Sequence, residues 1–209
     1  FFQSEKAAVL DKFASEVDMV SIHTPDEMLN SMFEWLKHQS NLGSRWARVR
    51  HNGYRDMTSD TDCFACINPE LALKRLTRVL SYQGSDGFAP RTFIHGEIRA
   101  NNFSDNTVWI NFTAASVLKE LGRKEILDIE IPYNDGTVGT MYEHLYRSVD
   151  FLYHFRGLHN LVKIWGGDWN DCMNTAGLKG LGESVWLSIA WYRANKMLME
   201  LAKLTGKDA

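Results

Sequence analysis

The stretch 164–177 (IWGGDWNDCMNTAG) concentrates residue types that can do chemistry. Asp168 and Asp171 are three positions apart, so a turn or the start of a helix brings both carboxyl groups to the same side. Trp165 and Trp169 can place apolar surface against these groups. Burial against an indole and proximity to another carboxylate both raise the pKa of a carboxyl group. A carboxylic acid that stays protonated near neutral pH can donate a proton to the leaving oxygen of a glycosidic bond.

Tryptophan also offers a flat apolar face on which a sugar ring can stack, so the stretch is compatible with a carbohydrate site. A structural interpretation fits the same residues. In that interpretation the aspartates form an Asx-turn and a helix cap, and the tryptophans belong to the core. The residue types alone leave both interpretations open.

Two further polar stretches are candidates for the same site. In 51–63 (HNGYRDMTSDTDC), Arg55 and Asp60 belong to a run of alternating charges that follows a glycine. Arginine and aspartate together can bind vicinal hydroxyl groups through paired hydrogen bonds, although a loop of surface ion pairs would show the same pattern. The stretch 82–97 adds four weaker candidates, Asp86, Arg91, His95 and Glu97.

Six segments with apolar residues at helical spacing must position these stretches. Residues 24–27 (TPDE) and the pair Thr140 and Glu143 predict capped helix starts, Asn68 precedes a first-turn proline, and Gly122 is placed as a C-cap. The helices are expected at 4–17, 24–39, 68–83, 104–121, 140–155 and 183–204.

The connections between these helices are unusually long. Loops are expected at 41–67, 84–103 and 157–182, and long loops in a compact helical protein are usually functional. Short strands are expected only at 19–22 and 92–98, and neither predicts a convincing hairpin. The sequence therefore predicts a mostly α-helical domain whose polar loops carry a cleft at one end.

The composition is that of a soluble globular protein, with 209 residues, 44% hydrophobic residues and a net charge of −3. No charge run favours a nucleic-acid or anionic-membrane partner, and no apolar stretch of about 18 residues predicts a transmembrane helix. No spacing matches a metal site, a phosphate-binding glycine loop or a Gly-x-Ser-x-Gly elbow. The odd number of cysteines suits a reducing compartment and no signal peptide is visible, so we expect a cytoplasmic protein.

Five segments occur in an order that resembles one enzyme family: GYRDMTSD, YQGSDG, SDNTVWINFTAASVLKELG, TMYEHLYRSVDF, and GGDWNDCMNTAG followed by GESVW. Over most of its length the chain is similar to glycoside hydrolase family 94. This family contains the inverting cellobiose, chitobiose and cellodextrin phosphorylases and the phosphorylase-like domain of cyclic β-1,2-glucan synthases. The GDWND segment with its downstream GESVW is the most specific part of the resemblance.

The resemblance implies an all-α fold that is part of an (α/α)6 barrel, with long polar loops forming the active-site end. It implies that Asp171 is the general acid. The adjacent tryptophan would line the sugar site, and the Arg-Asp stretch would bind the sugar whose bond is broken. The substrate-binding residues that it implies are Arg55, Asp60, Trp169, Asn170 and Asp168.

The implied reaction is inverting phosphorolysis of β-linked glucosides or gluco-oligosaccharides to an α-sugar 1-phosphate. Inorganic phosphate is then a co-substrate, and no metal ion or other cofactor is expected. One catalytic carboxylate suffices, because phosphate takes the place of the base-activated water of an inverting hydrolase. Family members are often dimers, so a homodimer of the full-length protein is expected.

The resemblance also predicts that residues 1–209 form an incomplete barrel. The chain begins at Phe1 rather than Met, and the N-terminal β-sandwich region and the last barrel helices of the family have no counterpart in it. The family's phosphate-binding histidine, threonine and glycine residues lie downstream of GESVW. We therefore expect the 209 residues to be inactive by themselves. Ser59 and Cys172 stand where the family usually has glutamine and glycine, which concerns the details of substrate recognition.

Two alternatives to an inverting phosphorylase are carried forward. The first is a phosphorylase of a related family or an inverting (α/α)6 glycoside hydrolase. Of these, the hydrolase would release reducing sugar without phosphate. The second is a non-catalytic carbohydrate-binding or oligomerisation fragment, which would bind oligosaccharides without turnover. The sequence leaves the glycosidic linkage open, because much of the acceptor site would lie outside the chain.

Overall fold

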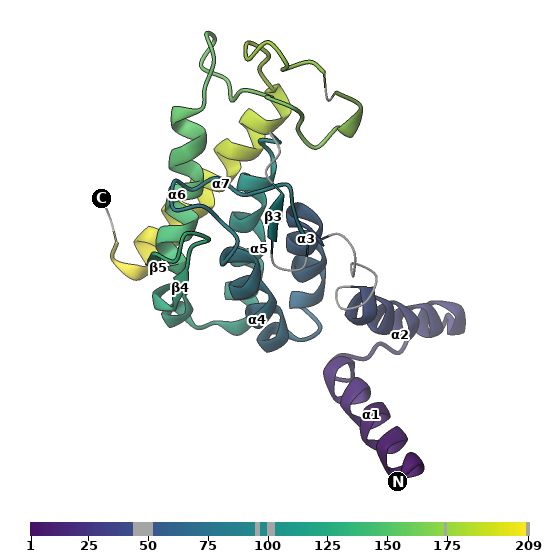
Figure 1. Ribbon diagram of the computed structural model, residues 1–209. Helices are drawn as coiled ribbons and strands as arrows, with labels where there is room; N and C mark the ends of the chain where they lie inside the picture. Colours follow the sequence, from purple (N-terminus) through teal and green to yellow (C-terminus); the bar gives the residue numbers. More distant parts are fainter. Residues whose placement is uncertain (44–51, 95–96, 100–102, 174, 208–209) are drawn as a thin grey trace.

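The computed structural model describes residues 1–43, 52–94, 97–99, 103–173 and 175–207. In these segments α-helices dominate and only short strands occur, so the predicted mostly helical fold is confirmed (Figure 1). Closure into an (α/α)6 barrel stays a prediction. No helix in the described segments is long and apolar enough to cross a membrane. The helices are α1 Phe2–Val17, α2 Glu27–Leu42, α3 Tyr54–Ala65, α4 Pro69–Leu80, α5 Asn106–Leu121, α6 Met141–His154 and α7 Val185–Thr205.

Three of the predicted helix ends are confirmed by their capping bonds. Thr140 and Glu143 form a capping box at the start of α6, in which each side chain accepts a hydrogen bond from the backbone N–H of the other residue. Asn68 caps α4 by accepting from the N–H of Leu71 at 3.0 Å. Gly122 ends α5 in the left-handed conformation with φ 63°, which costs glycine less than any other residue.

Helix α2 begins three residues later than predicted. The carboxylate of Asp26 accepts from the N–H of Met28 at 2.9 Å, so Asp26 is the N-cap. Thr24 instead donates its N–H to the side chain of Asn30 at 2.9 Å. Because the aspartate satisfies the first free N–H groups of the helix, the residues before it stay outside.

The largest correction concerns residues 41–67, which the sequence predicted to be a loop. Their second part forms α3, and the buried face of this helix includes Thr58 and Thr61. Both threonine hydroxyl groups donate at 2.7 Å to carbonyl oxygens in the preceding turn of the same helix. Such internal bonds allow threonine to be buried. The helical spacing was missed because polar residues occupy positions where the hydrophobic pattern requires apolar ones.

The strand predictions were also only partly right. Residues 92–98 were expected as one strand without a hairpin, but β2 (Thr92–Ile94) and β3 (Glu97–Arg99) pair antiparallel. Strand β1 (Asn52–Gly53) pairs with the other edge of β2, which gives the order β1-β2-β3. A second antiparallel pair, β4 (Glu130–Pro132) and β5 (Val138–Thr140), was not predicted. Strands of two or three residues are too short to show the alternation on which strand prediction depends.

The other strand prediction, at residues 19–22, is wrong. These residues form a turn and an irregular segment between α1 and α2. The carbonyl oxygen of Val20 accepts from Nζ of Lys37 at 2.6 Å. A side chain thus takes the bonding position that a neighbouring strand would have filled.

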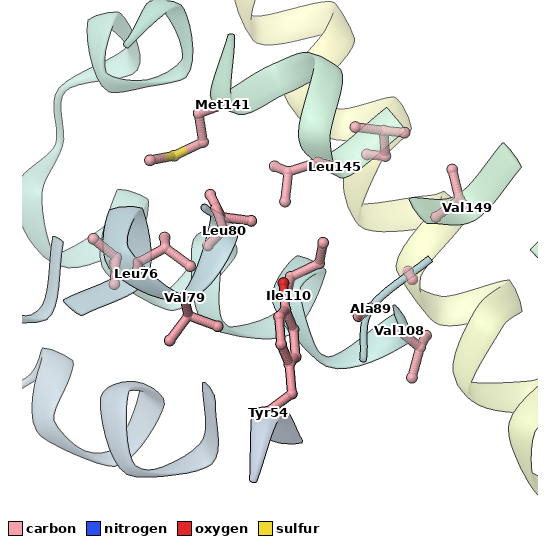
Figure 2. Close-up of a cluster of buried hydrophobic side chains, with 14 of the residues drawn as sticks. Tyr54, Leu76, Val79, Leu80, Ala89, Val108, Ile110, Met141, Leu145 and Val149 are labelled. Carbon is pink, nitrogen blue, oxygen red and sulfur yellow. The ribbon is translucent and has the colours of Figure 1, made fainter. Parts of the chain in front are cut away.

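The hydrophobic core is organised around α5, which contacts α3, α4, α6 and α7. Figure 2 shows Tyr54 of α3 in the same buried cluster as side chains of α4, α5 and α6. Tyr54 directly precedes Arg55, so burial of its ring fixes the first turn of α3 against α5. Fully buried members of this core include Tyr54, Leu76, Leu80, Ile110, Met141 and Leu145.

Helices α1 and α2 lie beside this core (Figure 1). Asn41 joins them to the rest of the chain, because its side chain donates to Glu16 at 2.7 Å and accepts from Arg75 at 2.8 Å. These bonds connect α1, α2 and α4. A small apolar cluster of Val17, Phe64 and Ile67 supports the same junction.

A polar network centred on His144 ties α6 to the loop after α4 and to β4. Gln83 donates to the carbonyl oxygens of Gly87 at 2.9 Å and His144 at 3.1 Å. The ring nitrogens of His144 lie 2.7 Å from the side-chain oxygen of Gln83 and 3.1 Å from the carbonyl oxygen of Ile131. Gln83 and His144 are both fully buried. This set, Gln83, Gly87, Ile131 and His144, is referred to below as the His144 network.

Candidate active site

Arg55, in the first turn of α3, connects two of the polar stretches that the sequence singled out. Its Nη2 donates to both carboxylate oxygens of Asp171, each at 2.7 Å. Its Nη1 donates to the carboxylate of Asp105 at 3.0 Å and to the carbonyl oxygens of Asp168 at 3.1 Å and Trp169 at 3.4 Å. One guanidinium group therefore joins α3, the start of α5 and the loop that carries Asp171. These five residues are called the Arg55 network below.

The small sheet and the start of α5 position Arg55. Tyr54 donates its N–H to the carbonyl oxygen of Arg91 at 2.9 Å, and Gly53 pairs with Thr92. The N–H of Arg55 donates to the side chain of Asn106 at 3.2 Å. The first turn of α3, whose N–H groups lack partners within the helix, is thus held by β2 on one side and by α5 on the other.

The loop that carries Asp171 is fixed by close backbone packing. The ring of Phe103 lies so close to Gly167 that a Cβ there would come within 2.6 Å of it. A Cβ at Gly177 would clash with the carbonyl oxygen of Trp165. Ser104 binds the loop with its N–H to the Gly167 carbonyl oxygen at 3.1 Å. The glycines of this motif are therefore needed because no side chain fits between the loop and its supports.

The side chain of Asp168 holds the loop itself. It is 6% exposed, and its two oxygens accept from the N–H of Asn170 at 2.9 Å and from the hydroxyl of Ser184 at 2.6 Å. Ser184 in turn caps α7. The Asx-turn and cap of the structural interpretation are therefore present at Asp168. Each carboxylate oxygen has a further lone pair, so the predicted contact of Asp168 with substrate stays a prediction.

Asp171 is far more exposed than Asp168. Its side chain is 55% exposed, against 20% for Arg55. The two indoles expected to enclose it have ring neighbours of their own in the described segments. Trp165 packs on Phe155, with ring centroids 4.9 Å apart, and Trp169 is 53% exposed. The nearest described partner of the Asp171 carboxylate is therefore the guanidinium group of Arg55 and not an indole.

Asp105 was not among the residues that the sequence predicted for the site. Its side chain is fully buried, and the same oxygen that binds Arg55 also accepts from Nε1 of Trp109 at 3.2 Å. Burial raises the pKa of Asp105, and Arg55 opposes this rise. For Arg55, burial would lower the pKa, but the charges and hydrogen bonds of Asp105 and Asp171 raise it overall. Asp105 was missed because it falls in the first turn of the helix predicted at 104–121, where an acidic residue is common.

Two cavities flank the loop. The smaller, of about 200 Å³, is lined by Gly53, Arg55, Asp56, Arg91, Thr92, Asn106 and Asp171. The larger, of about 390 Å³, has apolar and polar walls that include Asp168, Trp169, Asn170, Met173 and Trp186. The guanidinium of Arg55 lies 5.9 Å from the ring of Trp169. Residues 168–171 thus contribute to both cavities, with the ionic groups on one side and the exposed indole on the other.

The remaining predicted residues lie further from this centre. Asp60 is half-buried on α3, and a helical step of about 100° per residue places it roughly 140° around the axis from Arg55. The described bonds of Arg55 do not include Asp60.

Asn170 is exposed and accepts from the N–H of Cys172 at 3.1 Å. Of the weaker candidates, Arg91 lines the smaller cavity, Asp86 accepts from the N–H of Phe88, Glu97 is exposed, and His95 lies outside the described residues.

Within the described segments, no group of three or more histidine, cysteine, aspartate or glutamate side chains is arranged to hold a metal ion. The described residues beside the two cavities include one exposed carboxylate, its arginine partner and the neighbouring indole. An exposed carboxylate at the edge of a polar cavity can transfer a proton to or from a bound molecule.

Comparison with known proteins gives a consistent result. The sequence model of the glycosyl hydrolase 94 superfamily catalytic domain matches residues 12–209. The chain is 33% identical to solabiose phosphorylase of Paenibacillus borealis over 207 residues, which cover 99% of this chain and 27% of that protein. It is 27% identical to N,N'-diacetylchitobiose phosphorylase of Vibrio proteolyticus, over 90% of this chain and 28% of that protein.

A third relative is much longer than these two. The chain is 31% identical to the cyclic β-(1,2)-glucan synthase NdvB of Rhizobium meliloti, over 86% of this chain and 7% of that protein. The chain thus spans about a quarter of the two phosphorylases and a smaller share of the synthase. The match to the catalytic domain nevertheless extends over almost the entire chain, and the chain therefore belongs to the glycosyl hydrolase 94 superfamily.

Proposed function

We propose that the protein containing this chain is an inverting phosphorylase of β-linked glucosides or gluco-oligosaccharides, with Asp171 as the general acid. The observation that carries the proposal is the position of Asp171, whose half-exposed carboxylate lies at the edge of a polar cavity and is oriented by Arg55. Membership in a superfamily with several phosphorylase relatives supports the same reaction class.

In the proposed reaction, an oxygen of inorganic phosphate attacks the anomeric carbon of the donor sugar. The bond from that carbon to the glycosidic oxygen breaks, and Asp171 transfers its proton to the leaving oxygen. The products are an α-sugar 1-phosphate and a shortened acceptor. The phosphate-binding residues are expected in parts of the protein outside this chain.

The contact between Arg55 and Asp171 must change during this reaction. Both oxygens of Asp171 accept from the same Nη2, whereas a general acid needs one oxygen to carry a proton toward the leaving group. Sugar hydroxyl groups are good acceptors for a guanidinium N–H. We infer that a hydroxyl of the bound donor sugar replaces Asp171 on Nη2 and releases the carboxyl group toward the glycosidic oxygen.

The other residues have supporting roles in this proposal. The exposed indole of Trp169 stacks on a sugar ring, and Asn170, beside it, binds a sugar hydroxyl. Asp60 accepts a hydrogen bond from the donor sugar, which requires the sugar to extend along α3. Asp168 completes the sugar site and holds the loop.

The test is a phosphate-dependent assay on the whole protein with a panel of β-linked glucobioses. We expect α-sugar 1-phosphate to form only when inorganic phosphate is present, with inversion visible in the proton spectrum of the product. Phosphate-independent release of reducing sugar would select the inverting hydrolase instead. Binding without turnover would select the carbohydrate-binding alternative.

Size-exclusion chromatography of the whole protein tests whether it forms the expected homodimer. Fractionation of the cells that produce it tests the expected cytoplasmic location. Dialysis against a chelator tests the expectation that no metal ion is needed, since phosphorolysis should survive the treatment.

A further inference from the structure

We propose that Asp105 is a positioning residue, whose buried carboxylate fixes the guanidinium of Arg55 and, through it, the loop that carries Asp171. This inference rests on the proposed function, because positioning has a purpose only if Asp171 acts on a substrate. Asp105 does not line the smaller cavity, so its effect must pass through Arg55.

Asp105 has an unusual conformation for a residue at a helix start. It occupies the N-cap position of α5, yet its side chain makes no capping bond. Aspartate is favoured at this position because its carboxylate normally accepts from the first N–H groups of the helix. Here the carboxylate points away from its own helix and is fully buried. An ionised group in such a place requires a compensating partner, and Arg55 at 3.0 Å is that partner.

The side chain of Asp105 is itself held in place. Trp109, one turn further along α5, donates its indole N–H at 3.2 Å to the oxygen that binds Arg55. The next residue, Asn106, accepts from the backbone N–H of Arg55 at 3.2 Å. Two consecutive residues of α5 therefore fix both the main chain and the side chain of Arg55.

The geometry of the guanidinium group transmits this position to Asp171. Because the group is planar and rigid, fixing the direction of Nη1 also fixes that of Nη2. Nη1 binds Asp105 together with the carbonyl oxygens of Asp168 and Trp169, and Nη2 binds Asp171. A buried carboxylate behind the arginine thus determines where the exposed carboxylate in front of it lies.

This arrangement allows Arg55 to exchange partners without moving. When a sugar hydroxyl displaces Asp171, Arg55 keeps its charged bond to Asp105 and its bonds to the loop. Without the charge at residue 105, the guanidinium would follow whichever acceptor binds it most strongly. The loop carbonyl oxygens would then lose their fixed donor.

The experiment uses Asp105→Asn, which keeps the shape and one acceptor oxygen but removes the charge. A charged hydrogen bond contributes more than a neutral one, so we expect kcat/KM of the whole protein to fall by about 10- to 100-fold. The fall should appear in both KM and kcat, because Arg55 binds a sugar hydroxyl and also orients the loop that carries Asp171. The Tm should stay near that of the wild type, because Arg55 keeps its ion pair with Asp171 and the substitution removes the cost of burying a carboxylate.

A double-mutant cycle separates positioning through Arg55 from a general structural role. Arg55→Lys keeps the positive charge, but one ammonium group cannot hold Asp105, the loop and Asp171 together. In the Arg55→Lys background we expect Asp105→Asn to lower kcat/KM by less than about threefold. The matched control is Asp135→Asn, which removes a hydrogen-bonded carboxylate from the β4–β5 turn and should leave kcat/KM unchanged.

Three results would overturn the positioning role. They are an equal loss in both backgrounds, a loss of less than about threefold in the wild-type background, and a loss that follows a lowered Tm. If Asp105→Asn does not fold, the double variant Arg55→Lys with Asp105→Asn is compared with Arg55→Lys alone. The two differ by only one charge of the pair. A fall in kcat/KM of more than about tenfold between them overturns the role.

Failure of the proposed function gives a different pattern. If the wild type binds β-linked glucobioses in calorimetry but forms no sugar 1-phosphate, phosphorolysis is wrong. A weaker binding constant in Asp105→Asn then still supports positioning, and an unchanged constant overturns it. If the wild type neither binds nor converts these sugars, both inferences are overturned.

Discussion

The Arg55 network and the His144 network are both polar groups that join distant segments, but they differ in what they leave open. Every member of the His144 network is bonded to another part of the protein, and its two side chains are fully buried. The Arg55 network begins with the buried Asp105 and ends at the half-exposed Asp171. A closed network holds a fold together, whereas a network with one open end presents a charged group to a ligand.

The two networks also stand at different kinds of position. Gln83 and His144 connect a turn, a helix and a strand through backbone carbonyl oxygens. Arg55 connects two helix starts and a loop, next to a cavity. Free N–H groups at helix starts favour negative ligands. Both networks contain fully buried side chains, and they differ in the exposure of the last member, which in the Arg55 network is the half-exposed Asp171.

The strongest test of this contrast is Asp171→Asn in the whole protein. General acid catalysis typically contributes about 10²- to 10⁴-fold, so we expect kcat to fall by at least that order. Stability should change little, because the side chain is half exposed. The control is Asp128→Asn, which breaks the exposed ion pair with Lys207 and should keep full activity. Activity above about a tenth of wild type would remove Asp171 from the role.

Asp60→Ala tests whether the sugar-binding site extends along α3 beyond the Arg55 network. If Asp60 binds the donor sugar, its loss leaves a hydroxyl group of the bound sugar without its charged acceptor. We then expect kcat/KM to fall by the equivalent of roughly 2–5 kcal/mol. Steady-state kinetics with the preferred glucobiose measures the loss, and circular dichroism checks that α3 is intact. Wild-type kcat/KM would mean that the site ends at the Arg55 network. Cys63→Ala, at an exposed position of the same helix, serves as the control.

Gln83→Leu should give the opposite result, a loss of stability without a loss of chemistry. The substitution leaves the buried carbonyl oxygen of Gly87 and the ring Nδ1 of His144 without their partner Gln83, which costs about 1–3 kcal/mol each when uncompensated. Thermal unfolding should show a lower Tm, while kcat per folded molecule stays near wild type. Gln39→Leu, at an exposed position of α2, should change the Tm little. A selective fall in kcat would show that the two networks are coupled.

The smallest expected effect concerns pH. Burial lowers the pKa of His144 from its ordinary value of 6.5, helped by Arg147 and opposed by the Ile131 carbonyl oxygen and Glu143. As pH falls below 6.5, the unfolded chain binds a proton that the folded chain resists, so stability falls with acidification. The slope is at most about 1.4 kcal/mol per pH unit. We expect this slope between about pH 7 and pH 5 to disappear in His144→Asn; an unchanged slope would assign it to other groups.

Several features were predictable because each is encoded in a short stretch of sequence. The capping box of Thr140 and Glu143 and the left-handed Gly122 need only a few neighbouring residues. The GDWND stretch marked the loop that carries Asp171 for a similar reason, since glycines, aspartates and indoles seldom occur so close together. Local chemistry of this kind is visible without knowledge of the fold.

Other features could not be predicted because they depend on distant partners. Helix α3 hides its spacing behind threonines that are satisfied internally. Asp105 falls in the first turn of a predicted helix, and only the fold shows that it binds Arg55, 50 residues earlier in the chain. Asp171 was expected against indoles, but Arg55 reaches it from α3. In each case a long-range contact replaced the local interpretation.

Arg55 holds the loop through the main-chain oxygens of Asp168 and Trp169, which every amino acid would supply. The anchor is therefore indifferent to the identity of the side chain at residue 169. Substitutions at this exposed position can alter the wall of the larger cavity while the backbone beneath keeps its bond to Arg55. Residue 169 can therefore vary over evolution without loss of the support of the loop that carries Asp171.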